Sequence, residues 1–590
     1  MRFPTSAALG FVLVMASAPL PCRAADDYKP GPDSLPQAGV PKGELIKGQY
    51  TAKADSVFPG TERDYTVYLP PGLDKSKPSP FMVFQDGVIY QAPTVFDNLI
   101  ARKEIPPLIG IFIRPGVVPA ANPNALPRFN RSYEYDSVTD TYSRFLIDEV
   151  LPEIAKKHGL KLSEKGDDAA IAGNSSGGIC AFMVAWHRPD RFRRLFTGVG
   201  TYVGIHGADQ FPVLVRKMEP KPLRVYLQSG TGDNNLYCGD WWMANQMMER
   251  SLTWAGYEVN HTWGEGGHNA KHATAIFPEA LKWLWRGWPE EGLRTNPTNT
   301  SKWKGYEVVK DGSRWETAFH SNGKDAYCLA SSEDGTVATS GEKGEISLIK
   351  TGGDSVKLVS LNQSVYSISA VQNGSWLVGT AKDLIEGPAL FLCKLGVSPR
   401  KIEFEGRSPG QIAVSKTGRA FIGVSGGLNP PSTRSPEKFP ELGIILEQHH
   451  LPGQLCLSPD QTLLYGNDGG GTISASQIAP DGSIRFSQEF YLLETCNPNT
   501  DLFRRDGKMC VDTEGRLYVA TSLGIQVCDQ AGRVNFIIPT PQQPYDVCFG
   551  GKDLGELFIT CGDKIYKRAM KTHGIVSGQM APIKPPAPHL

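Results

Sequence analysis

Short apolar runs alternate with segments of helical periodicity over the first half of the chain. Four runs predict strands: Phe81–Phe84, Leu108–Ile113, Ala169–Ala172 and Leu223–Gln228. Of these, Phe81–Phe84 and Ala169–Ala172 are expected to be buried. Four segments with helical spacing of apolar residues lie between or after them: Tyr142–Ile154, Ile179–Trp186, Met243–Ala255 and Ala275–Trp288. Ahead of them, Gly48–Leu69 alternates around a turn at Pro59-Gly60, which predicts antiparallel strands. The first half therefore predicts an α/β domain with a mostly parallel sheet.

The pattern changes after a polar, proline-bearing break at Asn296–Thr300. Helical spacing gives way to short alternating strands separated by turns. Similar units begin near Tyr327, Val365, Pro409, Pro452, Gly507 and Pro544. Recurrence at about 40 to 50 residues is typical of propeller blades, each too small to bury its own apolar face. The second half therefore predicts an all-β propeller with six blades.

The N-terminus has the pattern of a secretory signal peptide. Met1-Arg2 precedes an apolar region over 7–20, and Cys22-Arg23-Ala24 provides a small-x-small cleavage site. We therefore expect the protein to be secreted or periplasmic. The whole chain divides into a signal peptide (1–24), an exposed leader (25–44), the α/β domain (45–292), a linker (293–304), the propeller (305–575) and a Pro-rich tail (576–590).

Composition narrows the range of partners. Lys plus Arg and Asp plus Glu are both 61, so no net field favours nucleic acid or an anionic membrane surface. No segment after the N-terminal region is long and apolar enough to span a bilayer. None of the 11 cysteines forms a CxxC pair, so a zinc or redox site is not indicated. The pattern assigns neither disulfides nor an oligomeric state.

The first chemical feature is Gly173-Asn174-Ser175-Ser176-Gly177, between a predicted strand and a predicted helix. Gly-x-Ser-x-Gly in this setting is a nucleophile elbow, in which the serine occupies a strained turn and small neighbours let strand and helix approach. Ser175 is then the nucleophile, and the backbone N–H of Ser176 is one oxyanion donor. The alternative is an ordinary strand-to-helix turn.

Partners for such a serine follow in the order Ser, Asp, His that α/β-hydrolases use. Asp233 follows a predicted strand through a Gly-rich turn, where a carboxylate can orient an imidazole. Asp240 and Glu265 are the alternatives, because strand ends are placed from sequence only to within a few residues. His268 lies in the Gly-rich loop after the last predicted strand, Tyr257–Trp263, and is the predicted base.

Further residues complete the predicted site. The loop after the Phe81–Phe84 strand offers the backbone N–H of Gly87 or Val88 as the second oxyanion donor. The predicted substrate-binding residues are Arg131, Glu134, Trp241 and Trp242. The tryptophans could stack on a sugar, but core or lid packing is the alternative. For the two charged residues the alternative is a solvated loop with local ion pairs.

Four motifs of the first half point to one family: Pro59–Arg63, Phe84–Gly87, Arg131–Tyr135 and Gly173–Gly178. The Gly-Gly-His ending at His268 fits the same pattern. With these motifs, residues from about 45 to 290 resemble the esterase family that includes enterochelin esterases and is similar to feruloyl esterases. The resemblance implies a serine esterase with an α/β-hydrolase fold that needs no cofactor.

A second resemblance lies in the later blades, at Ser522–Asp529, Cys548–Gly551 and Leu557–Thr560. These segments resemble gluconolactonase and regucalcin-like propellers, which implies a divalent metal in the central channel. Asp506 supplies one expected ligand, but Gly410 and Gly453 stand where the family's asparagines are expected. Because Ca²⁺ takes six to eight oxygen ligands, we predict no metal site. The propeller is then expected to be structural or to bind a ligand.

Together these features predict a secreted serine ester hydrolase that works through an acyl-enzyme. The expected substrate is a small-molecule or saccharide ester, either carbohydrate-linked or siderophore-like, which the propeller binds or positions. One alternative is a metal-dependent lactonase in the propeller, which metal dependence of activity would reveal. The other is a non-catalytic binding protein, which would be inert toward an activated ester.

Overall fold

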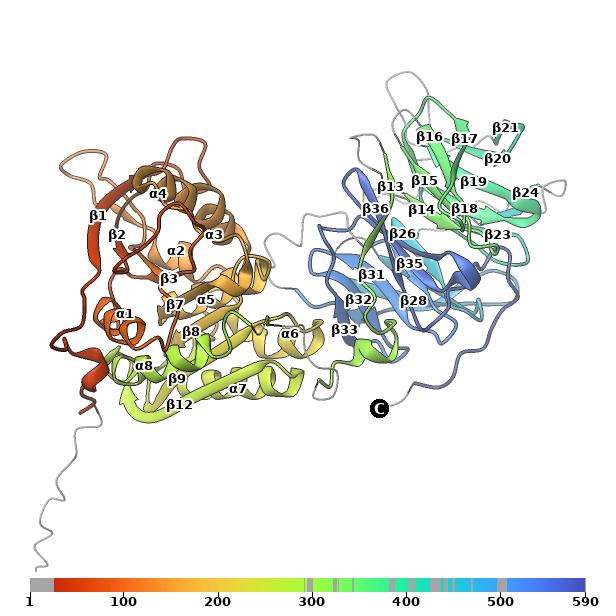
Figure 1. Cartoon of the computed structure of the whole chain (residues 1–590). Coiled ribbons are helices and arrows are strands. Elements are labelled where there is room, and N and C mark those ends of the chain that lie inside the picture. Colours follow the sequence, from red (N-terminus) through yellow and green to blue (C-terminus); the bar gives the residue numbers. More distant parts are fainter. Residues whose placement is uncertain are drawn as a thin grey trace, which may run out of the picture.

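Two domains lie side by side in the computed structural model, joined near residue 300 (Figure 1). The structure describes residues 26–290, 292–293, 301–321, 326, 328–341, 344–380, 388–402, 409–424, 437–439, 444–447, 451–467, 469, 471–495 and 507–588. The predicted signal peptide, Asp506 and most of the predicted linker lie outside these residues, so those predictions remain predictions. No helix in the described ranges is long and apolar enough to cross a membrane.

The N-terminal domain is built on a ten-stranded mixed sheet in the order β12-β9-β8-β7-β3-β4-β2-β5-β6, with β1 paired to β2. Its parallel part consists of β3 (Phe81–Gln85), β4 (Ile109–Ile113), β7 (Ala169–Asn174), β8 (Arg194–Gly198), β9 (Arg224–Gly232) and β12 (Glu258–Gly267). The remaining strands are β1 (Glu44–Thr51), β2 (Glu62–Leu69), β5 (Val117–Val118) and β6 (Arg128–Phe129), which pair antiparallel. The predicted α/β class and mostly parallel sheet are confirmed.

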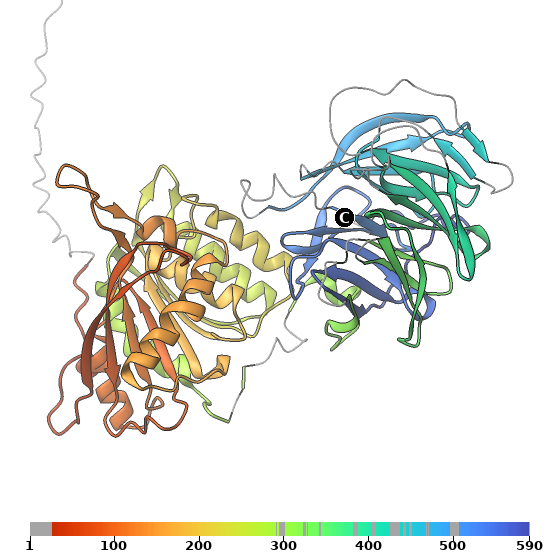
Figure 2. The same cartoon turned by 90° about the horizontal axis from the view of Figure 1, so that it is seen from above.

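Helices cover both faces of this sheet (Figure 2). The domain contains α1 (Ala92–Ala101), α2 (Arg131–Tyr135), α3 (Thr141–Arg144), α4 (Leu151–His158), α5 (Ser176–His187), α6 (Phe211–Lys217), α7 (Trp241–Ala255) and α8 (Lys271–Trp285). Along β3, Phe81 and Val83 pack on the α5 side, and Met82 and Phe84 pack on the α1 and α8 side. Because successive side chains of a strand point to opposite faces, a strand covered on both sides must be apolar throughout.

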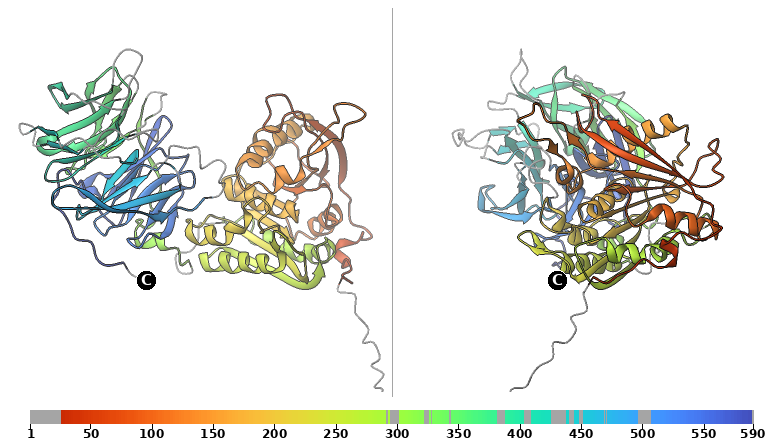
Figure 3. Two further views of the ribbon diagram at one scale, coloured as in Figure 1. Left: turned by 180° about the vertical axis from the view of Figure 1, so that it is seen from behind. Right: turned by 90° about the vertical axis from the view of Figure 1, so that its left-hand side faces the viewer.

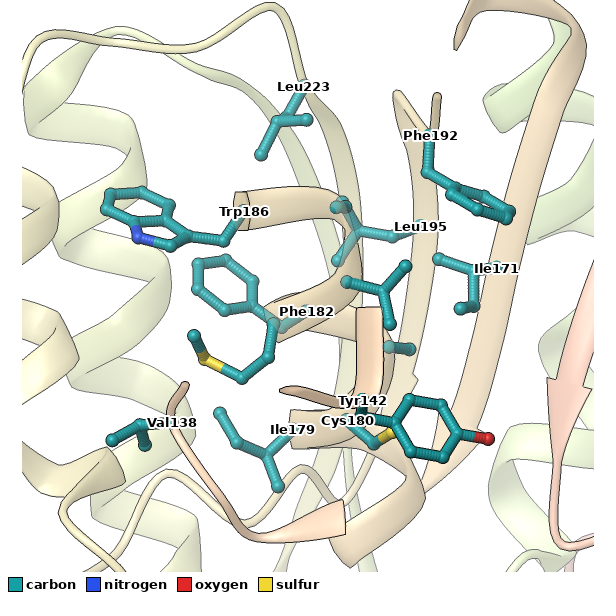
Figure 4. Packing of buried hydrophobic residues seen from close by; sticks show 14 of the residues in the cluster. Val138, Tyr142, Ile171, Ile179, Cys180, Phe182, Trp186, Phe192, Leu195 and Leu223 are labelled. Atoms are coloured by element: carbon teal, nitrogen blue, oxygen red, sulfur yellow. The ribbon is translucent and has the colours of Figure 1, made fainter. Parts of the chain in front are cut away.

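Helix α5, which follows the elbow, is packed on all sides. Its residues from Ser176 to Trp186 are all buried. Figure 4 shows Phe182 and Trp186 of α5 among Ile171 and Leu195 of the neighbouring strands. Burying side chains of this size contributes about 1.5 to 3 kcal/mol each. The turn that carries Ser175 is therefore held on a rigid support.

The C-terminal domain comprises six four-stranded sheets within the described residues, arranged as propeller blades (Figure 3). The first three blades are β14 (Leu329–Ser331), β15 (Val337–Ser340), β16 (Glu345–Ile349) and β17 (Ser355–Ser360); β18 (Val365–Val371), β19 (Ser375–Thr380), β20 (Ala389–Lys394) and β21 (Val397–Ile402); and β22 (Pro409–Val414), β23 (Arg419–Val424), β24 (Glu437–Phe439) and β25 (Ile444–Glu447). The next two are β26 (Gln454–Leu457), β27 (Leu463–Asn467), β28 (Thr472–Ile478) and β29 (Ile484–Leu492); and β30 (Met509–Val511), β31 (Leu517–Thr521), β32 (Gly524–Cys528) and β33 (Val534–Ile538). The predicted six-bladed architecture is confirmed, and each predicted unit begins within two residues of an observed inner strand.

The last blade is completed by a strand from the start of the domain. It consists of β34 (Asp546–Gly550), β35 (Glu556–Cys561), β36 (Lys564–Ala569) and β13 (Glu316–His320). β13 pairs antiparallel with β36, so the chain closes the ring with its first and last strands. A single short strand carries no repeat of its own, which is why the sequence did not indicate this closure.

After the last blade, the C-terminal tail stays in contact with the propeller. Ile575 to Gly578 help to line a central cavity of about 110 Å³, together with the inner strands of the blades. Gln579 is buried, donates to the Val371 carbonyl at 2.8 Å, and accepts from the Glu333 N–H at 2.7 Å. The first residues of the predicted Pro-rich tail therefore lie beside the central cavity and bond to two separate blades.

The two domains share a defined contact next to α6. Met218 forms a parallel bridge with Ile537 of β33. The Arg568 guanidinium donates to both carboxylate oxygens of Glu219, at 2.7 and 2.8 Å. Trp303, at the end of the predicted linker, is only 2% exposed. Bidentate pairing and a buried tryptophan hold the propeller against the α/β domain.

The described part of the predicted leader, 26–44, is mostly solvent-exposed but is fixed along the α/β domain. The Asn98 amide donates to the carbonyls of Asp33 and Leu35, both at 2.9 Å. The Gly43 N–H donates to the Asp97 carboxylate at 2.8 Å. The leader is therefore part of the folded domain and not a free extension.

Candidate active site

Ser175 occupies the sharp turn between β7 and α5. Its φ is +58° and its ψ is −122°, a conformation that costs a non-glycine residue energy and persists only when the surroundings enforce it. The Ser175 N–H donates to the Gly198 carbonyl at 2.8 Å. A Cβ on Gly173 would lie 1.9 Å from the Gly177 carbonyl oxygen, so strand and helix can approach this closely only with glycine there. The predicted elbow geometry is present.

His268 and Asp233 meet Ser175 in one chain of contacts. His268 Nε2 lies 2.7 Å from Ser175 Oγ, and His268 Nδ1 lies 2.6 Å from Asp233 Oδ1. A carboxylate can only accept, so Nδ1 carries the hydrogen and Nε2 is free to accept the serine proton. The Asp233 side chain is fully buried and also accepts from Ser229 Oγ at 2.7 Å and from the Asn234 N–H at 2.8 Å. Its orientation is thus set by three donors.

The two alternative acids lie elsewhere. Asp240 is the N-cap of α7 and accepts from the Met243 N–H at 3.0 Å. Glu265 is exposed to solvent. Of the three carboxylates considered from the sequence, the structure brings only Asp233 to His268.

The oxyanion prediction needs one correction. The Gly87 N–H donates to the Ile113 carbonyl at 3.0 Å, so this amide is already used at the edge of the sheet. The Val88 N–H donates to no acceptor among the described residues. Ser176 is the first residue of α5, where backbone N–H groups have no acceptor within the helix. Ser176 and Val88 are therefore the remaining pair of candidate donors.

Arg131 and Glu134, predicted together, have different environments. The Arg131 guanidinium donates to Asp86 at 2.7 and 2.8 Å, and its side chain remains 39% exposed. The Glu134 side chain is 0% exposed and pairs with the Arg63 guanidinium at 2.8 and 3.0 Å. A carboxylate enclosed in this way cannot reach a substrate, so its assignment to substrate binding is wrong. Arg131 stays a candidate.

Asp86 and Asp136 extend the polar surroundings of the elbow. Asp86 Oδ2 lies 2.9 Å from the position that a Cβ on Gly177 would take, so the Arg131–Asp86 pair abuts the elbow. Burial raises the pKa of Asp136, and the Ser132 hydroxyl, which donates to this carboxylate at 2.6 Å, opposes the rise. The proposed role of Ser176 rests on its backbone N–H and not on its hydroxyl.

Trp241 is a packing residue and not a platform for a sugar. It is 3% exposed, and its ring meets that of His268 edge to face at 5.5 Å between centroids. Its indole N–H donates to Thr201 Oγ1 at 3.2 Å, and this oxygen lies 3.4 Å from Ser175 Oγ. Trp242 is half-buried against Trp263 and stays a candidate for substrate contact.

Thr201 and Ser229 were not found from the sequence. They follow β8 or lie within β9, near the carboxyl ends of parallel strands where ligands of open α/β sheets bind. Position at a strand end was the available signal. It does not separate these residues from many other hydroxyl side chains.

Known protein families match the α/β domain and the propeller separately. Residues 56–284 match the family described as "Putative esterase", and residues 367–563 match the "SMP-30/Gluconolactonase/LRE-like region". The chain joins an esterase-family domain to a gluconolactonase-like propeller. The iron(III) enterobactin esterase of Escherichia coli K12 is 25% identical over 292 residues, covering 48% of this chain and 61% of that protein.

Two further relatives complete the comparison. Regucalcin of Sus scrofa is 40% identical over 57 residues, which is 9% of this chain and 19% of regucalcin. The solved enterobactin esterase of Shigella flexneri aligns with 42% of this chain and 61% of its own, with 20% identity and a TM-score of 0.31. The chain thus spans less than two thirds of the length of each of these proteins.

The gluconolactonase-like propeller has a lysine near its centre. Lys508 Nζ donates to Asp546 Oδ2 at 3.0 Å and lies 3.2 Å from Cys328 Sγ. Burial alone would lower the pKa of Lys508, but the Asp546 carboxylate raises it above its usual value. In the parts of the chain that the structure describes, no three His, Cys, Asp or Glu side chains gather as metal ligands would. The positive charge of the Lys508 ammonium group therefore balances the negative charge of the buried Asp546 carboxylate.

Replacing Lys508 by methionine is expected to destabilise the propeller. Asp546, 2% exposed, would keep a buried carboxylate without its cation, which costs about 3 to 5 kcal/mol. Urea unfolding measures the loss, with Lys552→Met as the exposed control. Adding Asp546→Asn to Lys508→Met should restore part of the stability, and equal stability of Lys508→Met and wild type would contradict the role of the pair.

Proposed function

We propose that this protein is a serine ester hydrolase whose catalytic residues are Ser175, His268 and Asp233. The observation that carries the proposal is the continuous contact from Ser175 Oγ to His268 Nε2, at 2.7 Å, and from His268 Nδ1 to Asp233 Oδ1, at 2.6 Å. A hydroxyl in a strained turn, next to an imidazole oriented by a buried carboxylate, is the arrangement of an activated nucleophile. The esterase-family match of residues 56–284 supports the same reaction class.

In the proposed mechanism, Ser175 Oγ attacks the ester carbonyl carbon and its proton passes to His268 Nε2. The carbonyl oxygen becomes an oxyanion, which the backbone N–H groups of Ser176 and Val88 stabilise. Collapse of this intermediate breaks the bond to the alcohol, and the alcohol leaves with the proton from His268. A water molecule then repeats the sequence on the acyl-enzyme and releases the acid.

We propose a siderophore-like or carbohydrate-linked ester as the substrate. The relatives matched by the α/β domain are named iron(III) enterobactin esterases, which supports the first of these classes. Arg131 lies next to the elbow with 39% of its side chain exposed, and would favour an anionic substituent. The gluconolactonase-like propeller, fixed against the α/β domain through Arg568, would bind or position the rest of the substrate.

The test combines turnover with covalent labelling. Purified protein is assayed with p-nitrophenyl acetate, with acetyl and feruloyl sugar esters, and with a catecholate trilactone. It is then treated with a serine-directed fluorophosphonate. We expect hydrolysis of at least one ester class and a single adduct on Ser175, located by peptide mass spectrometry. Inertness toward every ester, together with an unlabelled Ser175, would instead support a binding protein.

A further inference from the structure

The segment Asp26–Tyr28, here called the N-terminal strap, lies across the loop that carries His268. Asp26 Oδ1 accepts from the Gly267 N–H at 3.0 Å, and Asp26 Oδ2 accepts from the Asn269 amide at 2.8 Å. One carboxylate thus binds the residue before His268 and the residue after it. These contacts join residues that are more than 240 positions apart in the chain.

Tyr28 contacts the end of β12, which leads into the His268 loop. Its hydroxyl oxygen accepts from the Glu265 N–H at 2.9 Å. Its ring stacks on His272 of α8, with 4.0 Å between ring centroids and 20° between the planes. The strap therefore contacts the loop at three successive places and the helix that follows it.

Glycines at the end of β12, just before His268, make room for the N-terminal strap. A Cβ on Gly264 would lie 2.3 Å from the Tyr28 hydroxyl oxygen, and a Cβ on Gly266 would lie 3.1 Å from both Asp26 Oδ1 and the Tyr28 ring. Glycine-rich backbone has much conformational freedom, and the pairing of β12 with β9 is irregular between Gly264 and Gly267. Contacts from outside the sheet then help to hold His268, the residue after β12, in one place.

The Asn269 side chain is oriented so that only its N–H₂ can face Asp26. Asn269 Oδ1 accepts from the Lys271 N–H at 2.9 Å, at the start of α8. Turning the amide over would lose this bond and would oppose two acceptors at Asp26. The contact of the N-terminal strap with Asn269 therefore requires a hydrogen-bond acceptor, such as a carboxylate, at position 26.

We propose that Asp26 and Tyr28 are positioning residues that keep His268 Nε2 in line with Ser175 Oγ. This inference rests on the proposed serine hydrolase function, and it adds that part of the active-site order comes from the leader. Proton transfer requires His268 Nε2 and the serine oxygen to stay within hydrogen-bond distance. A displacement of about 1 Å at such a contact can cost about 10²-fold in rate.

The first experiment compares Asp26→Ala, Asp26→Asn and Tyr28→Phe in the whole protein. The matched control is Asp27→Ala, because Asp27 is the adjacent carboxylate, has a side chain 73% exposed and, among the described residues, makes only a 3.8 Å ion pair with Lys29. We expect Asp26→Ala to lower kcat for p-nitrophenyl acetate about 10- to 100-fold with KM within about twofold. Asp26→Asn and Tyr28→Phe should lie between this variant and wild type, and Asp27→Ala should match wild type.

Rates are normalised by active-site titration with the fluorophosphonate, which separates slow sites from unfolded protein. The second readout is the low-field proton NMR signal of the His268–Asp233 hydrogen bond. This signal should broaden or vanish in Asp26→Ala and persist in Asp27→Ala. It does not depend on turnover.

Two outcomes overturn the inference. One is an Asp26→Ala variant with wild-type kcat per titrated site and an unchanged proton signal. The other is a loss of activity that titration attributes wholly to fewer folded sites. Failure of the proposed function itself looks different, because wild type would then neither hydrolyse esters nor react with the fluorophosphonate.

Discussion

Replacing Ser175 by alanine is expected to lower the rate of ester hydrolysis by at least about 10³-fold while leaving the protein folded. Without the serine oxygen no acyl-enzyme can form, and only oxyanion stabilisation and binding remain to accelerate attack by water. The substitution should also leave the stability of the fold nearly unchanged. Alanine is similar in size to serine, and it would adopt the same strained φ of +58°. Steady-state kinetics with p-nitrophenyl acetate and a thermal unfolding curve measure the two effects.

The neighbouring serine is the control for this experiment. Ser176→Ala removes only the hydroxyl and keeps the backbone N–H at the start of α5, which is the group proposed as an oxyanion donor. Its rate should therefore stay within about tenfold of wild type. Near-full activity in Ser175→Ala, or a larger loss in Ser176→Ala, would show that the nucleophile has been misassigned.

Asp233→Asn is expected to lower kcat by about 10⁴-fold with a small effect on KM. The asparagine amide can donate to His268 Nδ1, which favours the tautomer that carries its hydrogen on Nε2, and that tautomer cannot accept the serine proton. Asp233 is fully buried and contacts His268 at 2.6 Å, so no other carboxylate can take its place without movement of the loop. The measurement is kcat and KM for one soluble ester, with titration of active sites.

Asp240→Asn is the matched control, and the structure changes what we expect of it. From the sequence alone, Asp240 was an alternative acid. As the N-cap of α7 it accepts from the Met243 N–H, and asparagine is also a good N-cap. Both kcat and stability should therefore remain near wild type, whereas a loss of kcat comparable to that of Asp233→Asn would reopen the choice of acid.

Local sequence patterns were sufficient for the architecture. A strand buried on both faces must be apolar, as in Phe81–Phe84, and a blade must repeat its inner strand, as at Val365 and Pro409. The elbow at Ser175 belongs to the same class, since Gly173 is required by its contact with Gly177, four residues further along the chain. In each case the physical cause acts between near neighbours in the chain, so it leaves a pattern there.

Contacts between distant residues were decided only by the tertiary structure. Glu134 is enclosed because Arg63 lies opposite it, and the Gly87 amide is occupied because Ile113 ends the adjacent strand. Sequence shows what a residue can donate or accept but not which distant group it meets. By itself, the sequence determined the fold class, the six blades and the serine with its histidine. The tertiary structure decided which carboxylate contacts His268 and that the Gly87 amide is already bonded, because a 2.6 Å contact depends on strand ends that local patterns place only to within several ångströms.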